Sequence, residues 1–142
     1  MSACTFFGHS ICSEEIRPIL RKEIIDLIEN RCVNKFYVGN QGQFDRLVSS
    51  VLQELKTEYD IDYALVLAYL PEKRDCADTR DFSDTIFPEG IETAPKRFAI
   101  SWRNRWMIKH SDYVITHVTH SWGGAAQFAE LARRQKKVVI NI

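Results

Sequence analysis

Two glycine-containing turns are the places in this sequence where the backbone itself could bind an anion. Residues 39–42 read Gly-Asn-Gln-Gly and residues 123–124 read Gly-Gly, and each turn stands between a strand-like and a helix-like segment. The first N–H groups of such a helix lack backbone acceptors and share its positive dipole end, so the two turns together predict a phosphate or carboxylate site. Either turn alone could simply allow the chain to bend sharply. Asn40 and Gln41 could read polar edges of a ligand, or could merely tolerate the turn geometry.

Side chains near these turns could complete a nucleotide site. Arg103 and Arg105 could hold a phosphate by paired hydrogen bonds or contact a ribose, or could form the solvated face of a helix. Trp122 precedes the glycine pair and could stack on a base, although a loop aromatic can equally fill a core gap or a dimer contact. Asp45 could accept a hydrogen bond from a ribose hydroxyl, or could stabilise the positive end of its own helix.

Histidines follow two of the predicted strands. His9 and His120 are expected to face a ligand as hydrogen-bonding groups. His117 and His120 have a usable metal-ligand spacing, but neither a CxxC pair nor a nearby carboxylate completes a zinc site, so we expect no metal and no cofactor. Cys12 lies near His9 in front of the first helix, where a dipole could activate a thiol, but no orienting acid accompanies it.

The length and composition of the chain limit the classes of protein to which it can belong. The chain has 142 residues, of which 45% are hydrophobic, with 19 Lys and Arg against 19 Asp and Glu. This length predicts a single domain over residues 1–142. Balanced charge without a basic block makes nucleic acid an unfavoured partner. The N-terminus lacks a signal-peptide pattern and the longest apolar run, residues 63–70, is too short to span a bilayer, so we expect a cytoplasmic protein without a membrane partner.

Strand-like and helix-like segments alternate along the chain. Strands are predicted at residues 4–7, 35–38, 63–68, 113–116 and 138–142, and helices at residues 13–30, after residue 42, at 98–110, and from the glycine pair to about 135. This order predicts an α/β, Rossmann-like three-layer fold, with a mainly parallel sheet of about five strands and helices on both faces. A long loop spans about residues 70–96. The candidate residues would then meet at the carboxyl edge of the sheet, where such folds bind ligands.

Six elements of the sequence occur in the order typical of one family. They are Gly8-His9, residues 39–45 (Gly-Asn-Gln-Gly-Gln-Phe-Asp), 103–107 (Arg-Asn-Arg-Trp-Met), 111–115 (Ser-Asp-Tyr-Val-Ile), 123–124 and 138–142 (Val-Val-Ile-Asn-Ile). Together they resemble the YpsA-like branch of the SLOG superfamily over nearly the whole chain. The resemblance implies one Rossmann-like SLOG domain that binds a nucleotide or a nucleotide-derived ligand. The superfamily includes the DNA-processing protein DprA, the LOG (lonely guy) enzymes and domains that sense NAD-derived signals in bacterial defence, and similarity to LOG proteins implies a homo-oligomer.

One of these elements bears on catalysis. LOG enzymes carry the motif PGGxGTxxE and cleave the bond between a base and ribose 5′-monophosphate. Residues 122–130 here read Trp-Gly-Gly-Ala-Ala-Gln-Phe-Ala-Glu, which keeps the glycine pair and the glutamate but replaces the proline, the third glycine and the threonine. The resemblance makes Arg103 and Glu130 a candidate catalytic pair. Glu130 could instead pair with Arg133 and Arg134 on the surface of its helix.

Two functions follow from these patterns. The first is a binding module that holds a nucleotide or an NAD- or ADP-ribose-derived molecule as a sensor, carrier or sequestering protein, with a role in bacterial or phage defence signalling implied by the resemblance. The alternative is a LOG-like phosphoribohydrolase, whereas binding of single strands in the manner of DprA is disfavoured by the balanced charge. The candidate ligand-binding residues are Gly8, His9, Ser10, Gly39, Asn40, Gln41, Gly42, Asp45, Arg103, Arg105, His120, Trp122, Gly123 and Gly124.

Overall fold

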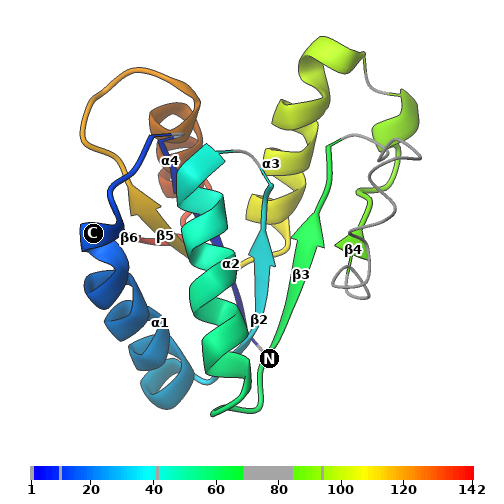
Figure 1. Cartoon of the computed structure of the whole chain (residues 1–142). Helices are drawn as coiled ribbons and strands as arrows, with labels where there is room; N and C mark the ends of the chain where they lie inside the picture. Colours follow the sequence, from blue (N-terminus) through cyan, green and yellow to red (C-terminus); the bar gives the residue numbers. More distant parts are fainter. Residues whose placement is uncertain (1, 10, 41, 69–84, 94) are drawn as a thin grey trace.

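The computed structural model describes residues 2–9, 11–40, 42–68, 85–93 and 95–142 (Figure 1). Within these ranges, six strands form one sheet in the order β4-β3-β2-β1-β5-β6, and all of their pairings are parallel. The strands are β1 (Ser2–Gly8), β2 (Val33–Val38), β3 (Asp62–Val66), β4 (Thr85–Ile86), β5 (Tyr113–His117) and β6 (Val138–Asn141). The helices are α1 (Arg17–Arg31), α2 (Gly42–Lys56), α3 (Ala99–Lys109) and α4 (Gly124–Arg134), with short 3-10 helices at Glu14–Ile16, Ile91–Thr93 and Lys96–Phe98.

The predicted α/β, Rossmann-like fold is confirmed, with a sheet of six strands rather than about five. The additional strand, β4, pairs with the end of β3 and falls inside the segment expected to be a loop, residues 70–96. A strand of two residues has no periodicity to read, which is why the sequence pattern did not predict it. Most of that loop, together with Ser10 and Gln41, lies outside the described residues. No helix in the described ranges has the length and apolar character that crossing a bilayer requires.

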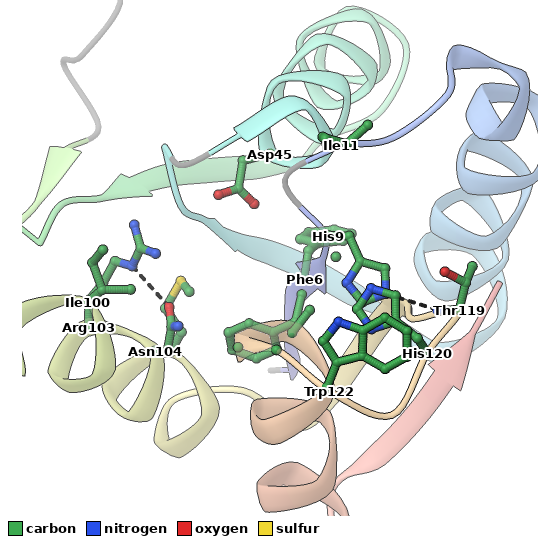
Figure 2. Close-up of a pocket in the computed structure, with 16 residues that line it drawn as sticks. Phe6, His9, Ile11, Asp45, Ile100, Arg103, Asn104, Thr119, His120 and Trp122 are labelled. Atoms are coloured by element: carbon green, nitrogen blue, oxygen red, sulfur yellow. Dashed lines mark hydrogen bonds between the residues drawn. The ribbon is translucent and has the colours of Figure 1, made fainter.

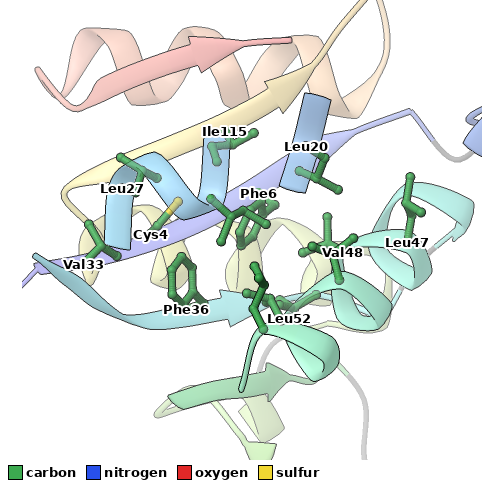
Figure 3. Close-up of a cluster of buried hydrophobic side chains, with 14 of the residues drawn as sticks. Cys4, Phe6, Leu20, Leu27, Val33, Phe36, Leu47, Val48, Leu52 and Ile115 are labelled. Atoms are coloured by element: carbon green, nitrogen blue, oxygen red, sulfur yellow. The ribbon is translucent and has the colours of Figure 1, made fainter. Parts of the chain in front are cut away.

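Helices cover both faces of the sheet, with α1 and α2 on one side and α3 and α4 on the other (Figure 1). The central strand β1 contributes to both layers because successive side chains of a strand point to opposite faces. Cys4 and Phe6 pack into the α1 and α2 layer, which Figure 3 shows, whereas Phe7 packs with Met107 and Phe128 in the α3 and α4 layer. Burial on two faces explains the continuous apolar runs of the inner strands and holds the end of β1 in a fixed position.

The order of the strands creates one point where two neighbouring loops diverge. From β1 the chain builds outward through β2 and β3 to β4, and then returns to place β5 on the opposite side of β1. The connections that follow β1 and β5 therefore leave the sheet toward opposite layers. In open α/β sheets, a crevice outside the carboxyl ends of the strands at such a switch point is the usual ligand site.

Candidate functional site

A pocket of about 580 Å³ opens at the switch point, next to the ends of β1 and β5 and the first turn of α4 (Figure 2). The sequence candidates among its lining residues are Gly8, His9, Asp45, Arg103, His120, Trp122, Gly123 and Gly124. The other lining residues are Phe6, Phe7, Ile11, Ile100, Asn104, Met107, Thr119 and Ala125. Segments that are far apart in the sequence thus meet around one open, mixed polar and apolar cavity, which is the form that small-molecule sites take.

Three aromatic rings form a column along one wall of this pocket. The His9 and His120 rings stack with their centroids 3.7 Å apart, and the His120 and Trp122 rings stack at 3.8 Å. The planes of neighbouring rings differ by only 15° and 18°. Trp122 remains 70% exposed even though its ring takes part in the column. The column therefore presents a large π-surface that a further flat ring could cover.

The hydrogen bonding of the column requires a neutral His9. The backbone N–H of Thr119 donates to His9 Nε2 at 3.0 Å, so the proton of that imidazole resides on Nδ1 (Figure 2). Burial, and then the neighbouring His120 and His117 rings, lower the pKa of His9, which also favours the neutral form. His120 Nδ1 is buried and has no hydrogen-bond partner among the described residues. Leaving a buried ring nitrogen without a partner is unfavourable by roughly 1–3 kcal/mol.

The opposite side of the pocket contains a buried arginine. Arg103 is 3% exposed, and its guanidinium donates from Nη1 to Asn40 Oδ1 at 3.3 Å and from Nε to Asn104 Oδ1 at 3.1 Å. Asp45, in the first turn of α2, is also buried. A Cβ on Gly39 would lie 2.8 Å from Asp45 Oδ2 and 3.0 Å from Arg103 Cζ, so both charged groups pack directly over this glycine. Gly39 thus has a steric reason to be glycine, and Asn40 orients the arginine.

The remaining glycines differ in what the protein requires of them. A Cβ on Gly8 would lie 2.3 Å from the buried ring of Phe44, so this position must be glycine for packing. Gly42 and Gly123 adopt φ of 87° and 95°, which other residues rarely tolerate. Gly124 has neither constraint, since no heavy atom of the described residues lies within 4 Å of a Cβ built there, apart from its chain neighbours and the backbone of its own helix. Among the described residues, packing therefore does not require a glycine at this first residue of α4, which lines the pocket.

Arg105 and Glu130 lie away from this pocket. Both are exposed and line a neighbouring hollow between α3 and α4. Glu130 Oε2 is 3.5 Å from Arg133 Nη1, and Glu130 Oε1 is 3.7 Å from Arg134 Nε, which is the pairing expected on a helix surface. The structure places Arg103 in the pocket and Glu130 outside it, so the two candidate catalytic residues do not face one cavity.

The end of β6 fixes the loop after β5, which carries His120 and Trp122 of the column. Asn141 Oδ1 accepts hydrogen bonds from Thr116 Oγ1 at 2.8 Å and from the Val118 N–H at 3.0 Å, and Asn141 Nδ2 donates to the Val118 carbonyl at 3.4 Å. His117 Nδ1 lies 3.0 Å from the Ile142 carbonyl. One amide side chain thus pairs with both polar groups of a loop residue, which fixes where the loop leaves the sheet.

Sequence reasoning did not identify Asn104, Asn141 or the Thr119 N–H as parts of the site. Asn104 lies three and four residues before Met107 and Ile108 on the buried stripe of α3, and Asn141 interrupts an apolar strand. A polar residue on the buried stripe of a helix is a signal that could have found Asn104. Asn141 is exposed, and an amide within an apolar strand is a weaker signal. The Thr119 N–H donates from the backbone, so residue type carries no signal for it.

The thiol of Cys12, the candidate nucleophile, lies in surroundings that do not activate it. Cys12 is not among the pocket-lining residues, and its backbone N–H donates to Gln43 Oε1 at 2.8 Å. Burial raises the pKa of the Cys12 thiol, which is opposite to the activation that a nucleophile needs. Within the described ranges, His, Cys, Asp and Glu side chains do not gather in groups of three or more that could hold a metal ion.

Comparison with known proteins defines the fold. No family model and no curated protein matches this sequence. Among solved structures, the chain is similar to DNA processing protein A (DprA) from Streptococcus pneumoniae, with a TM-score of 0.72 and 15% sequence identity. The match covers 99% of this chain and 50% of that protein, so the chain spans about half its length. The protein therefore has a DprA-like, Rossmann-like fold.

Proposed function

We propose that this protein binds a phosphate-bearing nucleotide derivative in the pocket at the switch point, as a sensor, carrier or sequestering protein. The observation that carries the proposal is Gly124, a glycine at the start of α4 for which packing gives no reason. Gly124 lowers helix propensity, and no contact with the described residues requires a glycine there, yet it lines the pocket at a helix N-terminus. A ligand that approaches the backbone closely accounts for such a glycine, and a phosphate suits the N–H groups there.

The other walls of the pocket suit the remaining parts of a nucleotide. The exposed face of Trp122 would stack on the base, and stacking of this kind accepts any base. The Nδ1–H of the neutral His9 would donate to a ribose or phosphate oxygen. Asp45 and Arg103 would bind ribose hydroxyls or a phosphate from the far side. We further propose that residues 1–142 form one nucleotide-binding domain of the SLOG type, on the family resemblance of its six sequence elements.

The placement of the charged groups favours binding over turnover. A LOG-like phosphoribohydrolase would need Arg103 and Glu130 around one substrate, but Glu130 faces a separate hollow and is paired with Arg133 and Arg134. The DprA-like fold carries no reaction with it, because the likeness at 15% identity is one of backbone architecture. Binding of an intact ligand therefore remains the function that the geometry supports best.

A retention assay tests this function directly. Near-stoichiometric protein is mixed with AMP, ADP-ribose, NAD, a cyclic dinucleotide or a short oligodeoxynucleotide, filtered, and both the retained and the free fractions are chromatographed. We expect a mononucleotide or dinucleotide to be retained and recovered intact. Free base in the filtrate that disappears in Glu130→Gln would establish the hydrolase instead. No retention of any nucleotide would refute the proposal.

A matched pair of variants locates the binding. Trp122→Ala removes an exposed ring from the pocket, whereas Phe98→Ala removes a ring that is 51% exposed and lies outside it. Base stacking contributes roughly 1–3 kcal/mol, so Trp122→Ala should weaken the retained ligand at least fivefold. Phe98→Ala should leave its affinity unchanged. Equal effects of the two variants would mean that the ligand does not use the ring column.

A further inference from the structure

A second hollow adjoins the proposed nucleotide pocket. It has a volume of about 660 Å³, lies between α3 and α4, and shares Gly123 and Gly124 with the pocket. Both cavities are lined by these two residues, and neither glycine carries a side chain that could stand between them. A ligand whose phosphate lies over the first turn of α4 can therefore continue from the pocket into the hollow.

Two arginines line the hollow and could contact a ligand that extends into it from the pocket. Arg105 is exposed on α3 and has no hydrogen-bond or ion-pair partner among the described residues. Arg134 lies on α4 with 75% of its side chain exposed, and its Nε is 3.7 Å from Glu130 Oε1. Arg105 and Arg134 outnumber the carboxylate of Glu130 among the lining residues, so the hollow favours an anion.

We infer that the hollow is a second phosphate subsite, and that the ligand is a nucleotide with a pyrophosphate rather than a mononucleotide. This inference rests on the proposed function of the neighbouring pocket. One phosphate lies over Gly123 and Gly124, and the next accepts hydrogen bonds from Arg105 and Arg134. The net positive charge of two arginines and one carboxylate matches a single additional phosphate. A site for a nucleic-acid strand would need a longer run of cations, one for each of several phosphates.

Glu130 would act as a competitor of the second phosphate at this subsite. Without a ligand, its carboxylate offsets the charge of Arg134; with a ligand, it competes with the second phosphate for that guanidinium. Glu130 also pairs with Arg133, which directly precedes Arg134 on the same helix but is not among the residues that line the hollow. Arg133 is therefore a matched control for Arg134, with the same charge, the same partner and a different place relative to the hollow.

Isothermal titration calorimetry with AMP and ADP-ribose tests the subsite. The wild-type protein should bind ADP-ribose about tenfold more tightly than AMP. Arg105→Ala and Arg134→Ala should each weaken ADP-ribose three- to tenfold and leave AMP unchanged, and Arg133→Ala should affect neither nucleotide. Glu130→Gln should tighten ADP-ribose about threefold. The advantage of ADP-ribose should also shrink when salt is raised, because these cations are exposed.

The outcomes separate this inference from the proposed function. If AMP binds in a manner that depends on Trp122, but ADP-ribose gains nothing or Arg134→Ala behaves like Arg133→Ala, only the second subsite is overturned. If neither AMP nor ADP-ribose binds, the pocket proposal fails and the subsite fails with it. An oligodeoxynucleotide that binds more tightly than ADP-ribose, through the same two arginines, would overturn the assignment to a small molecule.

Discussion

Replacement of Gly124 by alanine should separate ligand binding from stability. The new Cβ would have no neighbour within 4 Å, and the residue begins a helix, so we expect Gly124→Ala to stabilise the fold by about 0.5 kcal/mol. The melting temperature should rise by about 2 °C for a domain of this size. A phosphate oxygen bonded to the N–H at about 2.9 Å would have to move outward to clear the methyl group. Loss of one charge-assisted hydrogen bond costs about 1.5–3 kcal/mol, so affinity should fall at least tenfold.

Two measurements on the same variant check this reasoning. Urea unfolding gives the free energy of unfolding, and calorimetric titration with the nucleotide retained by the wild type gives the affinity. Higher or equal stability together with weaker binding is the expected combination. Unchanged affinity would refute the claim that Gly124 is bare for a ligand, and a loss of stability above about 1 kcal/mol would refute the geometric argument that the position is open.

Three further predictions address the rest of the site. Gly8→Ala is the same chemical change as Gly124→Ala, but its Cβ would meet the buried Phe44 ring at 2.3 Å, so the free energy of unfolding should fall by about 2–3 kcal/mol in urea; a neutral result would contradict the packing role of this glycine. Because folding lowers the pKa of His9 below its ordinary 6.5, the unfolded chain binds a proton that the folded chain lacks, and stability should drop as pH falls through 6.5. His9→Gln should reduce this drop between pH 7.5 and pH 5.5, and parallel pH profiles for the two proteins would exclude His9 as its source. Asn141→Ala should speed amide exchange at Val118 and weaken ligand binding, while Asn141→Asp, which keeps the acceptor, should retain most of both; identical exchange in all three proteins would show that Asn141 does not fasten the loop.

Local patterns were sufficient to predict the four α-helices and five of the six strands of the described residues. The stripe from Phe44 to Leu55 is buried at every apolar position, as the periodicity of α2 predicts, and the apolar run at residues 63–68 overlaps β3 (Asp62–Val66). These predictions hold because amphipathic spacing reports which face of an element is buried. Strand β4 was missed for the opposite reason, since Thr85 and Ile86 form a strand only because β3 offers them an edge.

The sequence by itself determined the alternating α/β elements and the parallel sheet that follows from them. Tertiary structure alone decided which candidates share a cavity, because the path of each loop depends on contacts across the chain, such as those of Asn141 with Val118 and Thr119 with His9. It also separated the glycines into two kinds, since the Phe44 ring requires Gly8 to be glycine whereas no contact with the described residues requires this of Gly124. The type of a residue shows which interactions it can make. Only the packing around it shows whether those interactions are already made within the protein or are open to a ligand.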